Sequence, residues 1–403
     1  MVFIPYLAPM TKKVILKAKR SAAVERFHPW VFSGAVKNIE GEVQDGDIVE
    51  VCKADGSYLA TGHYQEGSIT VRLFSFQQST PDQGFWDAKI GRALQYRRHL
   101  GLAGGQHSTN CFRLAHAEGD GLPGLIIDIY NKTAVVQCHS IGMHREMEKI
   151  SRALQNNFGG HLEAIYDKSA ETLPRQYALG IENRYVFGAG SPGPVLEYGN
   201  TFQVDWEAGQ KTGFFLDQRE NRRLAGQYAP DKKVLNAFCY SGGFSVYALQ
   251  AGAHSVDSVD VSKKAIELTE ANVQLNGLPP ERHRAHAMDV MDFLRSADND
   301  YELMIVDPPA FAKSLKKRHQ AVQGYKRLNA LAMSRIQPGG ILFTFSCSQV
   351  VSQQLFYDTI VAAALESGRQ ARVMHQLSQP ADHPVSIFHS EGSYLKGLVL
   401  YLE

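Results

Sequence analysis

The sequence has few cysteines, no long apolar run and no excess of either charge. Its five cysteines are spread over 403 residues without a C-x-x-C pair, so neither a zinc cluster nor a disulfide framework is expected, and a reducing cytoplasmic location is favoured. No apolar run approaches the ~18 residues of a membrane-spanning helix. Pro5 and Pro9 interrupt the mildly apolar start, which argues against a signal peptide. We therefore expect no membrane partner.

The charges nearly cancel, because 42 Lys and Arg residues face 41 Asp and Glu residues. Any nucleic-acid surface must then be a local patch and not a property of the whole chain. The 15 histidines show no H-x-x-x-H spacing, so no metal site is predicted. A hydrophobic content of 44% is that of an ordinary globular protein and is enough for more than one core.

The hydrophobic pattern changes twice along the chain. Residues 13–80 contain short stretches rich in β-branched and aromatic residues with Asp-Gly turns, which predicts a small β-barrel. The next stretch mixes helical periodicity at 85–100 and 142–157 with strands at 125–130 and 133–139, which is typical of an α+β domain. We predict an α/β protein with domains at 11–80, 81–200 and 201–403.

From about residue 230, strands and helices alternate. This rhythm predicts an open parallel sheet with helices on both faces. The expected strands are 234–238, 255–260, 303–306 and 341–345, and the expected helices are 244–251, 263–276, 325–336 and 353–366. Pro338, Gly339 and Gly340 are expected to end the third of these helices. In such sheets ligands bind at the carboxyl ends of the strands.

A glycine-containing turn follows the first of these strands. Residues 236–245 read Asn-Ala-Phe-Cys-Tyr-Ser-Gly-Gly-Phe-Ser, and glycines before a helix let the backbone approach a ligand. The spacing is not G-x-G-x-x-G, which disfavours a nicotinamide site. Asp260 ends the next strand, where a carboxylate can accept hydrogen bonds from both hydroxyls of a ribose. The alternative is an ordinary tight turn with a helix cap.

Two further strand ends carry reactive groups. Asp307 is followed by Pro308, Pro309, Ala310 and Phe311, and the two prolines hold the chain rigidly as it leaves the sheet. Cys347 lies between two serines at the end of the following strand. In a parallel sheet both side chains lie at one edge, where a thiolate can act as a nucleophile. The alternatives are an incidental loop acid and a buried core cysteine.

Together these elements resemble the Class I S-adenosylmethionine-dependent methyltransferases, and more narrowly the large-subunit rRNA cytosine-C5 methyltransferase I family. Residues 27–34, Phe-His-Pro-Trp-Val-Phe-Ser-Gly, resemble the start of that family's PUA module. Residues 209–219, Gly-Gln-Lys-Thr-Gly-Phe-Phe-Leu-Asp-Gln-Arg, resemble the segment that leads into its methyltransferase core. Residues 307–311 resemble its D-P-P-x-F motif, and Cys347 occupies the position of its catalytic cysteine.

The resemblance covers nearly the whole chain and implies its architecture. An N-terminal β-barrel PUA domain and a small α+β domain would precede a Rossmann-like Class I methyltransferase sheet. It also implies that S-adenosylmethionine is the cofactor and that Cys347 attacks carbon 6 of a cytosine while Asp307 contacts N3. The cofactor would contact Phe238, Tyr240, Ser241, Gly242, Gly243, Asp260, Asp289, Asp217 and Gln218. Asp289 would lie near the adenine.

A run of cations follows the Asp307 loop and could hold RNA phosphates. The expected RNA-binding residues are Lys313, Lys316, Lys317 and Arg318. The alternative is a solvated surface. The expected substrate is 23S rRNA, with the target base flipped out of its stack and stacked on Phe311 or Tyr325, which are alternatively core aromatics. The sequence leaves the assembly state open, and a homodimer is one expectation.

Three other functions compete with this one. A guanine-N7 methyltransferase could carry a similar D-P-P-x-F loop, but nitrogen is already nucleophilic and needs no thiol, so Cys347 separates the two. A non-catalytic RNA-binding protein would need only the β-barrel. A nicotinamide dehydrogenase is disfavoured by the missing glycine fingerprint.

Overall fold

The computed structural model describes residues 12–104, 108–312 and 314–403. Contacts divide the chain into two compact units. The first comprises the described residues up to Ser191 together with Trp206–Gly213 and Ala381–Gly392. The second comprises Pro192–Asp205, Phe214–Pro380 and Ser393–Glu403. No helix among the described residues is both long and apolar enough to cross a membrane.

The first unit begins with a β-module at residues 12–76. Its six strands pair in the order β2-β6-β5-β4-β1-β3. They are β1 (Lys13–Leu16), β2 (Trp30–Phe32), β3 (Val36–Glu40), β4 (Ile48–Cys52), β5 (Tyr58–Tyr64) and β6 (Ile69–Ser75), and α1 (Ala22–Glu25) lies between the first two. Valines of β1, β4 and β6 fill its core, as expected for β-branched residues that alternate along strands. The strands predicted in this stretch are confirmed.

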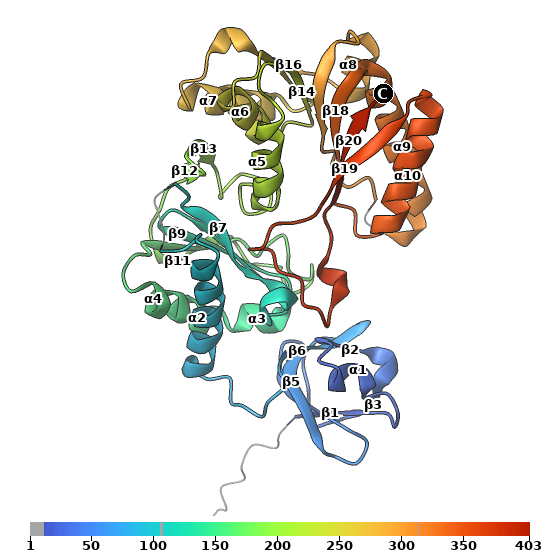
Figure 1. Ribbon diagram of the computed structural model, residues 1–403. Helices are drawn as coiled ribbons and strands as arrows, with labels where there is room; N and C mark the ends of the chain where they lie inside the picture. The colour runs from blue at the N-terminus through green and yellow to red at the C-terminus, as the bar shows by residue number, and fades with distance from the viewer. Residues whose placement is uncertain (1–11, 105–107, 313) are drawn as a thin grey trace, which may run out of the picture. The chain divides into compact units, whose positions relative to one another are not determined.

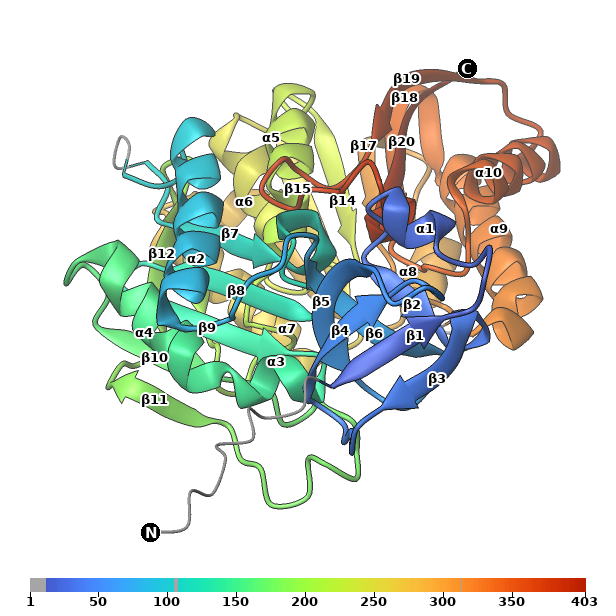
Figure 2. The same cartoon turned by 90° about the horizontal axis from the view of Figure 1, so that it is seen from below.

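A five-stranded sheet forms the rest of the first unit, in the order β11-β10-β9-β8-β7. Its strands are β7 (Cys111–His116), β8 (Leu125–Tyr130), β9 (Thr133–Cys138), β10 (Ala164–Asp167) and β11 (Arg184–Gly188), and its helices are α2 (Gln83–His99), α3 (Ile141–Arg145) and α4 (Met147–Phe158). Figure 2 shows α2 and α4 running alongside this sheet. The single helix predicted at 142–157 is two helices that meet at Glu146.

Two segments from far along the chain are built into the first unit. The Thr212 hydroxyl donates to the buried carboxylate of Asp128 at 2.6 Å. The buried guanidinium of Arg97 donates to the backbone carbonyl of Asp382 at 2.6 Å. Buried polar groups without such partners would be costly, so these bonds hold both segments in place.

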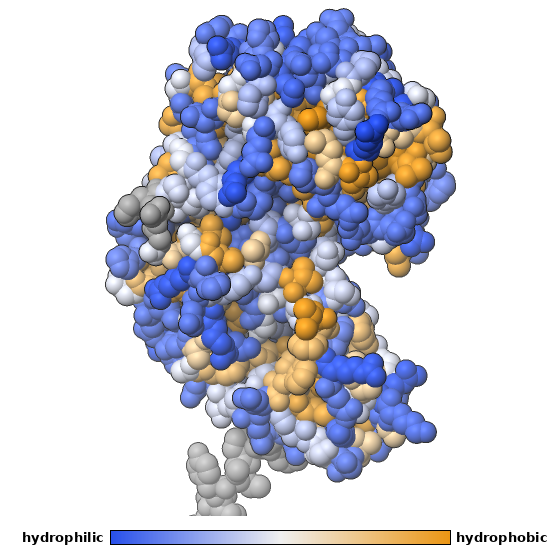
Figure 3. All heavy atoms as spheres, viewed as in Figure 1, coloured by the Kyte–Doolittle hydropathy of each residue, from blue (hydrophilic) through white to orange (hydrophobic). Residues whose placement is uncertain are grey.

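The segment Ala381–Gly392 also contacts the β-module. The Glu391 carboxylate lies 3.0 Å from His389 and 3.7 Å from His28. The ring of Phe388 packs on Phe27 at a centroid distance of 5.3 Å. Figure 3 shows apolar residues at the surface where this segment runs, in keeping with a Phe388 side chain that is 48% exposed.

The second unit contains a seven-stranded sheet in the order β16-β15-β14-β17-β18-β20-β19. Its strands are β14 (Lys233–Ala237), β15 (Ser255–Asp260), β16 (His283–Ala287), β17 (Tyr301–Val306), β18 (Ile336–Ser346), β19 (Ala371–Leu377) and β20 (Lys396–Leu402). The first five in spatial order are parallel, but β20 is antiparallel to both of its neighbours. The sheet is therefore mixed, and the expectation of a wholly parallel sheet was wrong at this edge.

Helices cover both faces of this sheet (Figure 1). One face carries α5 (Arg219–Gln227), α6 (Gly243–Gln250) and α7 (Lys263–Leu275), and the other carries α8 (Val290–Ser296), α9 (Arg318–Arg335) and α10 (Gln353–Ser367). A large apolar core lies between the sheet and α8–α10. The hairpin of β12 (Gly193–Glu197) and β13 (Asn200–Val204) packs on α7.

The segment around Pro338 differs from the sequence prediction. Helix α9 begins at Arg318 and ends at Arg335, and β18 already starts at Ile336. Ile336 pairs with Tyr301, and the register then shifts before Ile341 pairs with Leu303. The Pro-Gly-Gly sequence is therefore a bulge inside a strand and does not stop the helix. Gly339 adopts a φ of 82° there, which suits glycine.

Candidate functional site

Four neighbouring strand ends of the second unit define the site. Ala237 of β14 pairs with Val259 of β15 on one side and with Val306 of β17 on the other, and Val306 pairs with Thr344 of β18. The residues that follow these strands therefore lie at one edge of the sheet. They include the glycine-containing turn, Asp260, Asp307 and Cys347.

The turn after β14 has an unusual backbone. Phe238, Tyr240 and Gly242 have φ values of 62°, 47° and 70°. Residues other than glycine are strained at positive φ values, and such strained residues cluster at ligand sites. A Cβ atom at Gly242 would lie 2.5 Å from the Thr269 side chain, so only glycine fits there. Ser241, Gly242 and Gly243 are buried, whereas Phe238 and Tyr240 are partly exposed.

Side chains of α7 and β15 hold this turn in place. Thr269 donates to the carbonyl of Tyr240 at 3.0 Å, and Asn272 donates to the carbonyl of Ser241 at 2.8 Å. The Asp260 carboxylate accepts from the Tyr240 N–H at 3.1 Å and from the Ser262 N–H at 2.9 Å. Both Asp260 oxygens are therefore oriented at the end of β15.

Cys239, inside the turn, has the environment of a structural cysteine. Its side chain is buried, and its sulfur lies 3.5 Å from the Thr269 hydroxyl. Burial raises the pKa of this thiol to about 12. A thiol of that kind is not a nucleophile at neutral pH.

Asp289 lies beyond the end of β16, next to β15 in the sheet. It is exposed and is the N-cap of α8, where one carboxylate oxygen accepts from the Met291 and Asp292 N–H groups at 2.8 and 3.1 Å. These two hydrogen bonds explain why Asp289 stands at the start of α8, as an N-cap residue. It leaves the second carboxylate oxygen of Asp289 at the same edge of the sheet as Asp260.

Asp217 and Gln218 are buried in a 3₁₀ turn, Leu216–Gln218. The Gln218 amide donates to Asp307 at 2.9 Å and accepts from Asn221 at 2.6 Å. The bond from Asn221 sets the orientation of the amide, with its NH₂ group towards Asp307. The Tyr394 hydroxyl donates to Asp217 at 2.7 Å. Gln218 thus orients the carboxylate of Asp307, a contact that the sequence did not indicate.

Cys347 follows β18 and is partly exposed, unlike the other four cysteines, which are buried. The chain after it is held on both sides. The Ser348 hydroxyl donates to the Ala312 carbonyl at 2.7 Å, and the buried Lys396 ammonium donates to the Ser348 carbonyl at 2.7 Å. Sequence analysis missed Lys396. The available signal was a lone lysine within the otherwise apolar stretch 395–402.

Aromatic side chains line the region beside Cys347. Tyr325 is fully buried and packs on Phe311 at 4.6 Å and on Phe356 at 6.0 Å. Burial is the main cause that raises the pKa of Tyr325 to about 12, and the nearby Cys347 and Asp307 contribute in the same direction. A stacking role for Tyr325 was therefore wrong, because its ring has no exposed face. Phe311 remains accessible, since 37% of it is exposed.

Comparison with known proteins relates this geometry to a family. Residues 189–386 match the S-adenosylmethionine-dependent methyltransferases, and residues 14–76 match a PUA-like domain. The chain is 40% identical over 397 residues to the ribosomal RNA large subunit methyltransferase I of Pseudoalteromonas atlantica, with 97% of this chain and 99% of the relative covered. The protein of that name from Tolumonas auensis is 38% identical over 399 residues, with 97% and 99% covered. This chain belongs to the ribosomal RNA large subunit methyltransferase I family.

Solved structures confirm the fold. A protein from Streptococcus mutans described as a SAM-dependent methyltransferase matches with a TM-score of 0.82 and 21% identity, over 96% of this chain and 99% of that one. A methyltransferase solved in complex with SAH matches with a TM-score of 0.83 and 21% identity, with 96% and 99% of the two chains covered. The α/β fold with a methyltransferase sheet is thereby confirmed.

The methyltransferase site has features that fit S-adenosylmethionine. The glycine-containing turn after β14, with its positive φ values, would let backbone approach the cofactor, and the oriented carboxylate of Asp260 suits the hydroxyls of a ribose. The cofactor of this family member is S-adenosylmethionine.

The basic run after Asp307 lies at the start of α9. Lys316 and Lys317 are in a 3₁₀ turn, Leu315–Lys317, and Arg318 is the first residue of the helix. All three are exposed. Lys313 lies outside the described residues.

Proposed function

We propose that this enzyme methylates carbon 5 of a cytosine in 23S rRNA, with Cys347 as a covalent nucleophile and Asp307 at N3. The observation that carries the proposal is the register of β17 and β18. Because Val306 pairs with Thr344, Asp307 and Cys347 follow adjacent parallel strands beside the strained turn after β14. An acid and a thiol thus share one sheet edge with the turn that we expect to contact the cofactor.

The chemistry requires this combination. Carbon 5 of cytosine is too weak a nucleophile to be methylated unaided. A Cys347 thiolate forms a bond to carbon 6, and the π pair of the 5,6 bond forms a 4,5 double bond. The π pair of the C4–N3 bond moves to N3, to which the carboxyl group of Asp307 donates a proton. Carbon 5 is then enamine-like. Gln218, which is bonded to Asp307 at 2.9 Å, holds that carboxyl group in position.

The adduct must then collapse. S-adenosylmethionine, when bound, supplies an electrophilic methyl group. Asp307 or a water molecule takes the proton from carbon 5, the 5,6 double bond forms again, and the bond from carbon 6 to sulfur breaks and releases the Cys347 thiolate. N3 loses the proton it gained. The net change is the replacement of the hydrogen on carbon 5 by a methyl group, with release of one proton.

RNA recognition is assigned to two regions. Lys316, Lys317 and Arg318 are exposed after the Asp307 loop, where cations can contact phosphates, and Lys313 belongs to the same run in the sequence. The PUA-like β-module is the second region. The relatives are named for ribosomal RNA of the large subunit, which supports an rRNA substrate and a cytoplasmic site of action. A homodimer stays a prediction.

The domain boundaries remain those expected from the sequence, at 11–80, 81–200 and 201–403. Three separate main sheets support this division. The segment Ala381–Gly392 joins the first unit although it lies within the third range.

RNA that carries 5-fluorocytosine at the target tests the function directly. Fluorine on carbon 5 cannot leave as a proton does, so the bond from carbon 6 to Cys347 persists. We expect a stable one-to-one complex in a denaturing gel and a modified peptide that contains Cys347 by mass spectrometry. RNA with ordinary cytosine is the control. Methylation of guanine N7 in nucleoside analysis, with no adduct formed, would contradict the proposal.

The role of Asp260 predicts a loss of cofactor affinity. Asp260→Asn removes a charge-assisted acceptor for ribose hydroxyls, so S-adenosylmethionine should bind about 10–100-fold more weakly. Isothermal titration calorimetry measures this. Asp358→Asn, at an exposed position of α10, is the control. Equal affinities of both variants for S-adenosylmethionine would show that Asp260 only stabilises the turn after β14 and does not bind the cofactor.

A further inference from the structure

Lys396 is a charged residue in a buried place. It is the first residue of β20 and only 6% exposed. It pairs with Ser346 of the antiparallel neighbour β18. Directly opposite residues share a face of the sheet, so Lys396 lies beside the last residue before Cys347.

The ammonium group of Lys396 is held by backbone. It donates to the carbonyl oxygens of Ser348 and Tyr394, each at 2.7 Å. Ser348 directly follows Cys347, so one of these bonds fixes the chain at the proposed nucleophile. An ammonium has three donors, and the two carbonyls take two of them.

The surroundings of this lysine favour a pairing with Cys347. Burial lowers the pKa of Lys396 to about 8, and Cys347 opposes that shift. Cys347 is the titratable group whose charge acts on Lys396, Tyr357 of α10 lines the same cavity, and His375 lies on the neighbouring strand β19. At pH 7 the ammonium still carries its charge, which is lost as the pH rises above about 8.

We propose that Lys396 is a positioning residue for Cys347. The ammonium group of Lys396 fixes the backbone after the cysteine and stabilises the thiolate that attacks the pyrimidine. A neutral donor would be enough to bind two carbonyls. A buried charge, by contrast, lowers the stability of the fold unless it is paired and hydrogen-bonded. A nearby ammonium is a known means of increasing the thiolate fraction of a cysteine. This inference rests on the proposed function of Cys347.

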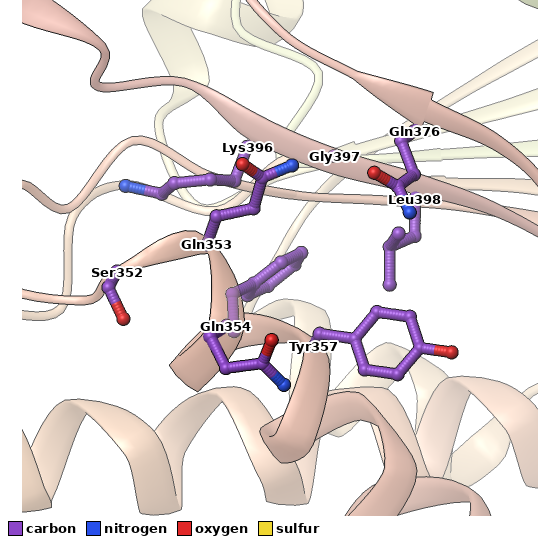
Figure 4. A pocket seen from close by; sticks show the side chains of 9 residues that line it. Ser352, Gln353, Gln354, Tyr357, Gln376, Lys396, Gly397 and Leu398 are labelled. Atoms are coloured by element: carbon purple, nitrogen blue, oxygen red, sulfur yellow. The ribbon is translucent and has the colours of Figure 1, made fainter. Parts of the chain in front are cut away.

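A cavity beside Lys396 makes substitutions at this position practical. It has a volume of about 480 Å³ and lies between α10 and the strands β19 and β20. Figure 4 shows the side chains of Lys396 and Gln353 among those that line it. Because the lysine stem borders open space, a replacement of similar length can relax without disturbing the core.

The test is the pH dependence of Cys347 alkylation by iodoacetamide, followed by peptide mass spectrometry. In the wild-type protein the midpoint should lie below the value of about 8.5 for a free thiol. Lys396→Met should raise the midpoint by about one pH unit or more, which is about tenfold slower alkylation at pH 7. Lys396→Arg keeps the charge and should restore the low midpoint.

Lys326→Met is the matched control, since Lys326 is a partly exposed lysine of α9 that pairs with Glu366. Its midpoint should equal that of the wild type. A wild-type midpoint at or above that of a free thiol would overturn the inference even if no variant folds. So would slower alkylation of Lys396→Met with an unchanged midpoint, which indicates backbone support alone. Because alkylation requires no methyl transfer, these outcomes are independent of whether the proposed reaction is correct.

Discussion

Cys347→Ala should abolish methyl transfer and leave cofactor binding intact. The covalent route needs a sulfur to activate carbon 5, and loss of a nucleophile costs on the order of 10⁴-fold or more in rate. The side chain is partly exposed beyond the end of β18, so alanine leaves no large cavity in the core. Transfer of radioactive methyl groups to rRNA measures the rate, and calorimetry measures binding of S-adenosylmethionine.

Cys52→Ala provides the control for this experiment. Cys52 is a buried residue of β4 in the first unit, and its loss should change stability slightly and turnover little. If Cys347→Ala retained turnover, the covalent mechanism would be excluded. The guanine-N7 alternative would then become the leading hypothesis, because attack by a ring nitrogen requires no thiol.

The second large effect is expected on stability, from Glu197→Gln. The fully buried Glu197 carboxylate accepts two hydrogen bonds from Arg222, at 2.8 and 2.7 Å, and one from the Tyr247 hydroxyl at 3.1 Å. The variant has nearly the same shape but leaves the Arg222 charge buried and unbalanced. Breaking a buried pair in this way costs about 3–5 kcal/mol, which should appear as a lower midpoint for the second unit in urea unfolding.

A surface ion pair supplies the comparison. Glu366→Gln removes the partner of Lys326 at a site where both side chains are partly exposed, and such pairs contribute less than about 1 kcal/mol. Equal destabilisation by both variants would mean that Arg222 finds another partner. Arg222 also donates to the Phe215 carbonyl at 3.0 Å, close to Asp217 and Gln218, so Glu197→Gln should weaken cofactor binding as well.

Much of the second unit was predictable because its signals are local. The strand at 255–260 coincides with β15, and the predicted helix at 353–366 differs from α10 by one residue at its end. Strand propensity, helix caps and Gly or Pro positions act over a few residues. Local signals failed where tertiary pairing overrides them. The Pro-Gly-Gly sequence became a bulge because Ile336 pairs with Tyr301 across the sheet.

The sequence by itself determined which candidate site residues follow the strand ends, and in what order: the turn after β14, Asp260, Asp307 and Cys347. Parallel strands place such residues at one edge, so spacing along the chain was sufficient. Only the tertiary structure decided which groups support them. Gln218 reaches Asp307, and Lys396 reaches the Ser348 carbonyl, through contacts between residues far apart in the chain. No local pattern encodes such contacts, since they depend on how β20 pairs antiparallel to β18 and where a buried 3₁₀ turn packs.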